Sequence, residues 1–149
     1  MKKILYLDMD NVLVDFPSGL ARIPEEIQRE YEDRGMDEIP GIFALMKPMP
    51  GAVEAFNALA EVFDVYILST APWENPSAWS DKLEWVKKHL GEKAWKRLIL
   101  SHHKNLNRGD FLVDDRDKNG AGEFTGTLIT FVPNETSWPD LVEELIAQA

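Results

Sequence analysis

Acidic, hydroxyl and basic side chains follow four short apolar runs of this sequence. They are Asp8 and Asp10 after residues 3–7, Ser69 and Thr70 after 65–68, Lys104 shortly after 98–100, and Asp114 and Asp115 after 111–113. Side chains two positions apart on an extended segment point the same way, so Asp8 and Asp10 can enter one crevice. If the four runs are neighbouring parallel strands, all of these residues gather at one edge of a sheet.

Carboxylates that converge in one crevice repel each other unless a cation neutralises them. Mg²⁺ is the simplest candidate, because it is a hard ion that is typically held by one or two carboxylates together with water and substrate phosphate. A hydroxyl at Ser69 or Thr70 and the ammonium group of Lys104 would bind the phosphoryl oxygens of a substrate. The set therefore predicts a Mg²⁺-containing site for a small phosphate ester.

The elements that must position these residues alternate between strand and helix. We expect buried strands at residues 3–7, 65–68, 98–100, 111–113 and 127–131. We expect three helices. The first begins near Ala52, and the last spans 138–147. The second runs from an N-cap at Ser77 through His89, with Leu83, Val86 and Leu90 on one face. This alternation predicts an α/β fold with a doubly wound, mostly parallel sheet, helices on both faces, and ligands beyond the carboxyl ends of the strands.

Residues 16–49 do not fit this alternation. They hold an acidic, helical stretch at 24–34, then Gly35, Pro40 and Gly41, then a second apolar stretch at 42–46. Because the segment directly follows a strand's carboxyl end, we expect a small helical cap over the binding crevice, within a single domain spanning 1–149. An ordinary helical crossover is the alternative.

The composition excludes several classes of function. The chain has 149 residues, 16 basic and 26 acidic side chains, a net charge of −10 and no cysteine, so thiol chemistry and disulfides are excluded. No apolar run approaches the roughly 20 residues of a membrane span, and no signal peptide is recognisable. We therefore expect a cytoplasmic monomer or homodimer. The acidic balance disfavours nucleic acid polymers as partners.

The ordered motifs of the chain resemble those of a known superfamily. The stretch 8–12, the pair Ser69-Thr70, Lys104 and the pair Asp114-Asp115 resemble, in this order, the four motifs of the haloacid dehalogenase (HAD) superfamily. Within it, residues 8–16, 50–55, 84–86, 90–91 and 109–115 resemble the 5′(3′)-deoxyribonucleotidases. The resemblance implies a Mg²⁺-dependent phosphomonoesterase of deoxyribonucleotide catabolism, which releases phosphate from nucleoside monophosphates through an aspartyl-phosphate intermediate.

The resemblance also implies roles for individual residues. Asp8 would attack phosphorus, and Asp10 would protonate the leaving alkoxide and then deprotonate the hydrolytic water. The implied ligands of Mg²⁺ are Asp8, the backbone carbonyl of Asp10 and Asp114, with Asp115 in support. Lys104 would neutralise the phosphoryl group.

The implied hydroxyl donor to that group is Thr70 or Ser69. Thr70 is favoured because the family's threonine lies two residues before a proline, as Thr70 does before Pro72. Asn11 departs from the Gly or Thr that the family often has there.

Substrate identity depends on the residues near the crevice. Phe16, Phe43 and Trp73 are candidates for stacking on a nucleobase, although aromatic side chains at such positions also serve as packing residues. Two alternatives to a nucleotidase stay open, namely a HAD phosphatase for another small phosphate ester and a weakly catalytic regulatory or binding relative. A receiver domain, which uses similar residues, is disfavoured because its acidic pair precedes the hydroxyl residue and the lysine.

Overall fold

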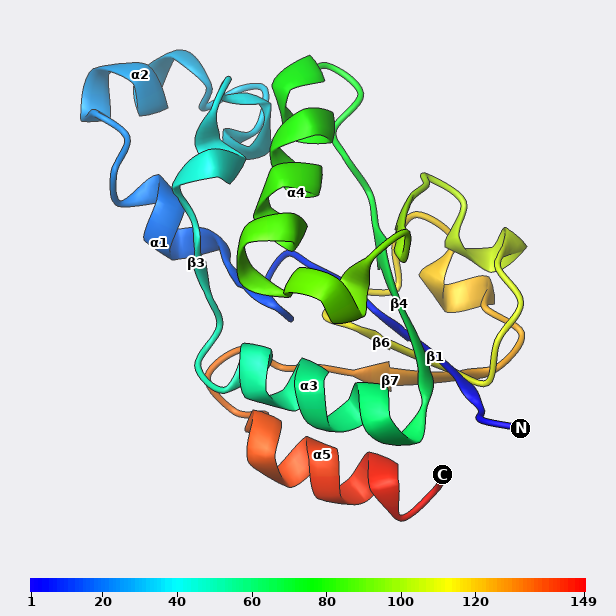
Figure 1. Ribbon diagram of the computed structural model, residues 1–149. Coiled ribbons are helices and arrows are strands. Elements are labelled where there is room, and N and C mark those ends of the chain that lie inside the picture. Colours follow the sequence, from blue (N-terminus) through cyan, green and yellow to red (C-terminus); the bar gives the residue numbers. More distant parts are fainter.

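A five-stranded parallel sheet forms the centre of the computed structural model, which describes residues 1–149 (Figure 1). The strands are β1 (Ile4–Leu7), β4 (Asp64–Ser69), β5 (Leu98–Leu100), β6 (Phe111–Asp114) and β7 (Thr127–Thr130), in the order β5-β4-β1-β6-β7. Leu7 pairs with Ile67 of β4 and with Val113 of β6, so the three central strands end at the same level. The α/β fold with a parallel sheet is confirmed.

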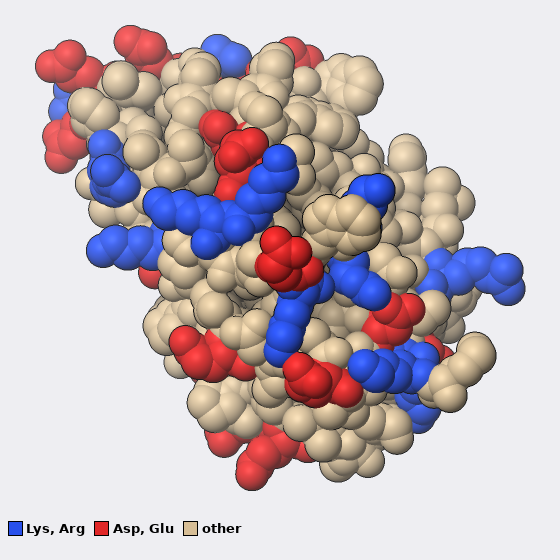
Figure 2. Space-filling model, in the orientation of Figure 1, with Lys and Arg blue, Asp and Glu red and all other residues tan.

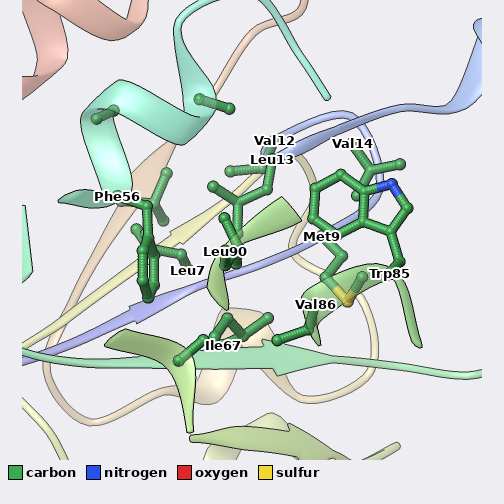
Figure 3. Close-up of a cluster of buried hydrophobic side chains, with 14 of the residues drawn as sticks. Leu7, Met9, Val12, Leu13, Val14, Phe56, Ile67, Trp85, Val86 and Leu90 are labelled. Carbon is green, nitrogen blue, oxygen red and sulfur yellow. The ribbon is translucent and has the colours of Figure 1, made fainter. Parts of the chain in front are cut away.

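Three helices cover one face of this sheet. They are α3 (Ala52–Val62), α4 (Pro76–His89), which continues into the turn η3 (Gly91–Ala94), and α5 (Trp138–Ile146). Figure 3 shows Phe56 of α3 and Val86 of α4 beside Leu7 and Ile67 of the sheet, all buried in one apolar cluster. None of the helices combines the length and the apolar composition that crossing a bilayer requires.

The opposite face of the sheet carries no α-helix. Tyr6, Leu68 and Leu112 pack there against Ala121 and Phe124, in a second and smaller cluster. The connections 101–110 and 115–126 form only the 3₁₀ turns η4 (Lys104–Leu106) and η5 (Ala121–Glu123). The expectation of helices on both faces is therefore corrected, because these connections are too short to hold a helix of several turns.

The start of α4 also differs from the sequence prediction. Asn75, not Ser77, is the N-cap, and Ser77 lies in the first turn of the helix. The Asn75 amide donates hydrogen bonds to the carbonyls of Asp37 and Ile39 at 2.9 and 3.1 Å, and Ser77 Oγ accepts one from the Gly41 N–H at 2.9 Å. These two polar side chains fasten α4 to the segment 16–49 instead of closing the helix.

The segment 16–49 folds into short pieces over the carboxyl ends of the strands (Figure 1). The two-residue strands β2 (Val14–Asp15) and β3 (Lys47–Pro48) pair in antiparallel fashion and close its base. Between them lie α1 (Phe16–Leu20), α2 (Glu25–Glu30), η1 (Met36–Glu38) and η2 (Ile42–Leu45). The helix predicted for 24–34 is shorter because the chain turns through 31–34 into Gly35, whose φ of 129° favours glycine.

Candidate active site

The carboxyl ends of the strands surround a pocket of about 330 Å³. The residues that the sequence placed after the strands and that line it are Asp8, Asp10, Thr70, Lys104 and Asp115. Phe16, Met36 and Asp37 line it from the segment 16–49, and Asn11, Arg116 and Asn119 from the neighbouring loops. The fold therefore brings residues that are more than a hundred positions apart in the sequence into one site.

Lys104 forms ion pairs with Asp8, which follows β1, and with Asp114, which ends β6. Its ammonium nitrogen lies 3.0 Å from Asp8 Oδ1 and 2.5 Å from Asp114 Oδ2, and all three residues are buried. Burial alone would lower the pKa of Lys104, but the two carboxylates outweigh it and raise that pKa above its usual value. The lysine is thus held as a cation.

Three carboxylates of the site lie close enough to share one cation. One ligand oxygen from each of Asp8, Asp114 and Asp115 falls within 4.8 Å of the others. Burial raises the pKa of all three carboxyl groups, so the Lys104 ammonium only partly compensates their charge. A set of oxygen ligands with uncompensated negative charge fits Mg²⁺. The side chain of Asp10 lies outside this group, and its predicted contribution through the backbone carbonyl stays a prediction.

A tight turn after Asp10 sets the direction of the chain at the site. Asn11 has a φ of 62°, in the left-handed region that asparagine tolerates better than most residues. The N–H groups of Val12, Leu13 and Val14 all donate to the carbonyl of Met9, at 2.8 to 3.0 Å. The departure from Gly or Thr at position 11 is thus compatible with the turn.

The structure separates Ser69 from Thr70. Thr70 lines the pocket, and its hydroxyl donates a hydrogen bond of 2.7 Å to the carbonyl of Ser101. Ser69 is fully buried behind the pocket and accepts a hydrogen bond of 2.8 Å from Lys82. Of the two candidate residues, only Thr70 lines the pocket.

The three candidate aromatic residues have different surroundings. Phe16 lines the pocket. Phe43 is buried in the apolar core and does not line it, although its ring meets that of Phe16 edge-on at 5.9 Å. Trp73 is 76% exposed, stands against His102 at 5.8 Å and is also absent from the pocket wall. The structure thus brings only Phe16 to the site.

Lys82 is the main residue that sequence reasoning missed. Its side chain is fully buried on α4, and its ammonium group donates to both carboxylate oxygens of Asp10, at 3.1 and 3.2 Å, and to Ser69. The helical periodicity of α4 could have predicted that Lys82 is buried, because position 82 shares a face with the buried residues Ala78 and Val86. Leu83, which was expected on that face, is 41% exposed.

Asp37 was also missed. It reaches the pocket from η1, and burial, followed by the charges of Asp10 and Glu38, raises the pKa of its carboxyl group. Nothing in its local sequence context distinguishes it from the other acids of the segment 16–49, because only the fold of that segment turns it toward the pocket.

The parallel sheet with acids at its carboxyl edge is the architecture of the HAD-like hydrolases. A crystal structure of a haloacid dehalogenase-like family hydrolase from Xanthomonas campestris superposes with a TM-score of 0.57, covering 99% of this chain and 97% of that one. Its sequence is 11% identical, so this likeness concerns the fold.

Sequence comparisons define the family within this class. Residues 19–137 match the family model of the 5′ nucleotidase, deoxy (pyrimidine), cytosolic type C proteins. A "Putative 5′(3′)-deoxyribonucleotidase" of Vibrio phage KVP40 is 56% identical over 148 residues, covering 99% of this chain and 86% of the relative. The human "5′(3′)-deoxyribonucleotidase, cytosolic type" is 31% identical, covering 74% and 69%. The chain belongs to the 5′(3′)-deoxyribonucleotidase family, and is thus a HAD-type nucleotidase, a hydrolase of phosphoric monoesters.

Proposed function

We propose that this protein hydrolyses deoxynucleoside monophosphates to deoxynucleosides and inorganic phosphate, with Asp8 as the nucleophile and Mg²⁺ as the cofactor. The observation that carries the proposal is the shared pocket at the carboxyl edge of the sheet, where Asp8, Asp10, Thr70 and Lys104 face one space. The names of the phage and human relatives support the choice of a deoxynucleotide as substrate.

The reaction proceeds in two displacements at phosphorus. A carboxylate oxygen of Asp8 attacks phosphorus, the bond from phosphorus to the ester oxygen breaks, and Asp10 gives its proton to the departing alkoxide. Asp10 then takes a proton from a water molecule, which attacks the aspartyl-phosphate and releases inorganic phosphate with the Asp8 carboxylate restored. Lys104 and Thr70 bind the phosphoryl oxygens throughout.

The acids that hold Lys104 in the structure are also the proposed metal ligands. Asp8, the backbone carbonyl of Asp10 and Asp114 would hold Mg²⁺, with Asp115 in support. When bound, the ion supplies positive charge that polarises the phosphoryl group and offsets the repulsion between an anionic substrate and the acids. Lys104 contacts two of these ligands at 2.5 and 3.0 Å, so it orients them.

The segment 16–49 acts in this proposal as a small cap on a single domain that spans 1–149. It contributes Phe16, Met36 and Asp37 to the pocket, which supports a role in substrate selection. In this proposal Phe16, which lines the pocket, contacts the nucleobase, and Phe43 packs edge-on against its ring. The pocket volume of about 330 Å³ lies at the lower end of the roughly 300–1,000 Å³ range of small-molecule sites, which suits a mononucleotide.

The location and the partners of the protein are inferred from a named relative and from the distribution of charge. The human relative is named as a cytosolic type, which supports a cytoplasmic location, and the expectation of a monomer or homodimer stays a prediction. Acidic and basic side chains are interspersed over the face in Figure 2, without a continuous basic stripe on that face. This mixture and the net charge of −10 argue for a small anionic substrate instead of a nucleic acid polymer.

A phosphate-release screen tests the proposal. Purified protein with Mg²⁺ is offered deoxyribo- and ribonucleoside 5′- and 3′-monophosphates, sugar phosphates and small organic phosphates. We expect fastest release from deoxynucleoside monophosphates, and no release above background from Asp8→Asn. Preference for another ester would contradict the substrate assignment, and wild-type rates in Asp8→Asn would contradict the nucleophile. Negligible release from every compound would favour a regulatory relative.

A further inference from the structure

The fully buried lysine on α4 is a feature that the reaction above does not use. The Lys82 side chain has no exposed surface, yet it carries an ammonium group that is costly to remove from water unless it is paired. Its three N–H groups find oxygen partners on Asp10 and Ser69, and its nitrogen lies 4.4 Å above the ring of Phe43. The site is thus built around this cation.

Lys82 does not reach the substrate space itself. It is absent from the pocket wall, whereas the Asp10 side chain is on the wall and 29% exposed. The carboxylate of Asp10 therefore lies between the lysine and the pocket. Of the residues on the pocket wall, Lys82 forms hydrogen bonds with Asp10, whereas Lys104 lines the pocket itself and contacts Asp8 directly.

We propose that Lys82 is a positioning residue that holds the Asp10 carboxylate in the orientation required for proton transfer to the leaving group. The inference rests on the proposed function, in which Asp10 is the general acid and base. Two contacts of 3.1 and 3.2 Å from one nitrogen to the two oxygens of Asp10 direct the carboxylate toward the lysine, and α4 and Ser69 of β4 anchor the lysine. Proton transfer depends steeply on such placement.

The contact with Phe43 connects this lysine to the segment 16–49. Phe43 belongs to η2, packs edge-on against Phe16 of the pocket wall and offers its ring face to the ammonium group. Lys82 thereby links Asp10 to Phe43, and Phe43 packs against Phe16, the residue proposed to contact the base. The placement of the general acid and the shape of the substrate pocket thus share one set of buried contacts.

The test compares two esters that differ in their need for a proton. An alkoxide leaving group such as that of a deoxynucleoside monophosphate requires protonation, whereas the phenolate of 4-nitrophenyl phosphate leaves without it. The variant Lys82→Met removes the charge at similar length, and Lys87→Met removes an exposed lysine of the same helix as a control. The value of kcat/KM reports the steps up to release of the first product.

We expect Lys82→Met to lower kcat/KM for the deoxynucleotide by about 10²-fold and for the aryl phosphate by less than about 3-fold, with Lys87→Met unchanged. In the Asp10→Asn background the same substitution has little further effect, because the two residues act as one unit. Equal losses with both esters, or a full additional loss in the Asp10→Asn background, would overturn the proposal.

Two additional measurements keep the outcome decisive. If Lys82→Met does not fold, Ser69→Ala retains the lysine without one of its anchors and is expected to show the same selective loss in smaller measure. Crystal structures of the wild type and Lys82→Met test the positioning without turnover, and an Asp10 carboxylate that keeps its place in the variant contradicts it. Absence of phosphate release from both esters in the wild type would instead refute the proposed function.

Discussion

Asp8 and Asp10 lie two residues apart, and each is paired with a different buried lysine. Asp8 contacts Lys104, which also holds Asp114, whereas Asp10 contacts Lys82 of α4. The first pair belongs to the proposed metal and phosphate end of the site, and the second to the proposed acid–base end. Two neighbouring carboxylates can therefore perform different tasks because different cations orient them.

Removal of the Lys104 charge tests its double role. Lys104→Met leaves Asp8 and Asp114 buried without their shared cation, so we expect the free energy of unfolding of the metal-free protein to fall by about 3 kcal/mol. We also expect kcat/KM to fall by about 10²-fold or more, because the phosphoryl group loses a compensating charge. Urea unfolding with a chelator and steady-state kinetics measure the two effects. Lys118→Met, at an exposed lysine, is the control and should change neither.

The backbone at Asn11 gives a second residue-scale prediction. Because φ at this position is 62°, Asn11→Val should destabilise the protein by about 1–3 kcal/mol, whereas Asn11→Gly should stay within about 1 kcal/mol of the wild type. Urea unfolding of the two variants measures this difference. Equal stability of both would show that the turn does not constrain the residue.

The residues of the site could be predicted from the sequence to the extent that each lies shortly after the end of a strand. Asp8, Asp10, Thr70, Lys104 and Asp115 all do so, and all line the pocket. Residues whose placement depends on how separate elements pack could not be predicted in this way. Asp37 reaches the pocket through the fold of the segment 16–49, and the same dependence left Phe43 and Trp73 off the pocket wall.

At the scale of elements, the loop after β6 supports the turn that carries Lys104. The Lys104 N–H donates to the carbonyl of Asn119 at 2.8 Å, and the next residue, Gly120, has a φ of 83°. A Cβ built on Gly120 would lie 2.9 Å from the backbone nitrogen of Lys104 and would clash with the side chain of Asn105. The proximity of η4 to this loop therefore requires glycine at this position.

Gly120→Ala should displace η4 and with it Lys104. We expect a loss of about 1–3 kcal/mol in the free energy of unfolding, together with a lower kcat/KM for any phosphate monoester. Gly91→Ala is the matched control, since Gly91 also has a positive φ, of 66°, but no atom lies within 4 Å of the position that a Cβ would take there. Gly91→Ala should therefore lower the free energy of unfolding only by the cost of placing alanine at a positive φ, and should leave kcat/KM unchanged. Equal effects on kcat/KM would contradict the role of close packing at Gly120.

The elements themselves were predictable where the apolar pattern is strong and not where polar contacts decide. The strands and the helices α3 and α5 agree with their apolar periodicity. The start of α4 does not, because it is determined by hydrogen bonds with the segment 16–49, in which Asn75 donates to Asp37 and Ser77 accepts from Gly41. The face of the sheet that lacks an α-helix follows from the short connections 101–110 and 115–126, which form only 3₁₀ turns.

At the scale of the whole molecule, the stability of the protein should depend jointly on Mg²⁺ and pH. Burial raises the pKa of Asp8, Asp114 and Asp115 in the folded chain, so the folded state binds more protons than the unfolded state. The resulting stability is complete below the unfolded pKa, near 4, and is lost as pH rises through the raised folded values. The free energy of unfolding of the metal-free protein should therefore fall as pH rises from about 4 through the raised pKa values of the folded chain.

Mg²⁺ should reverse this loss, because it binds the ionised carboxylates of the folded chain. We expect a rise in Tm on addition of Mg²⁺ at pH 7 that corresponds to about 2.7 kcal/mol at one hundred times the dissociation constant, and a much smaller rise at pH 4.5. Thermal unfolding with Mg²⁺ or with a chelator measures it. Asp114→Asn should reduce the response, and an unchanged response in this variant would contradict the proposed ligands.

The net charge of −10 gains a more specific interpretation from the structure. Three of the 26 acids form one group, of which the two buried members, Asp8 and Asp114, contact Lys104, so part of the negative charge is gathered where a divalent cation would offset it. The face of the molecule drawn in Figure 2 mixes charges of both signs. An acidic protein can thus accept an anionic substrate at one site.

The central claim is that Asp8 carries the phosphoryl group during turnover. The most direct test is an acid quench of the Asp10→Asn variant after mixing with 4-nitrophenyl phosphate and Mg²⁺, followed by peptide mass spectrometry to locate the phosphoryl group. The phenolate of this ester leaves without protonation, whereas Asp10→Asn cannot activate the hydrolytic water, so we expect a phosphoryl group on Asp8 that accumulates in this variant and is absent from Asp8→Asn. A phosphoryl group on another residue, or undiminished phosphate release by Asp8→Asn, would contradict it.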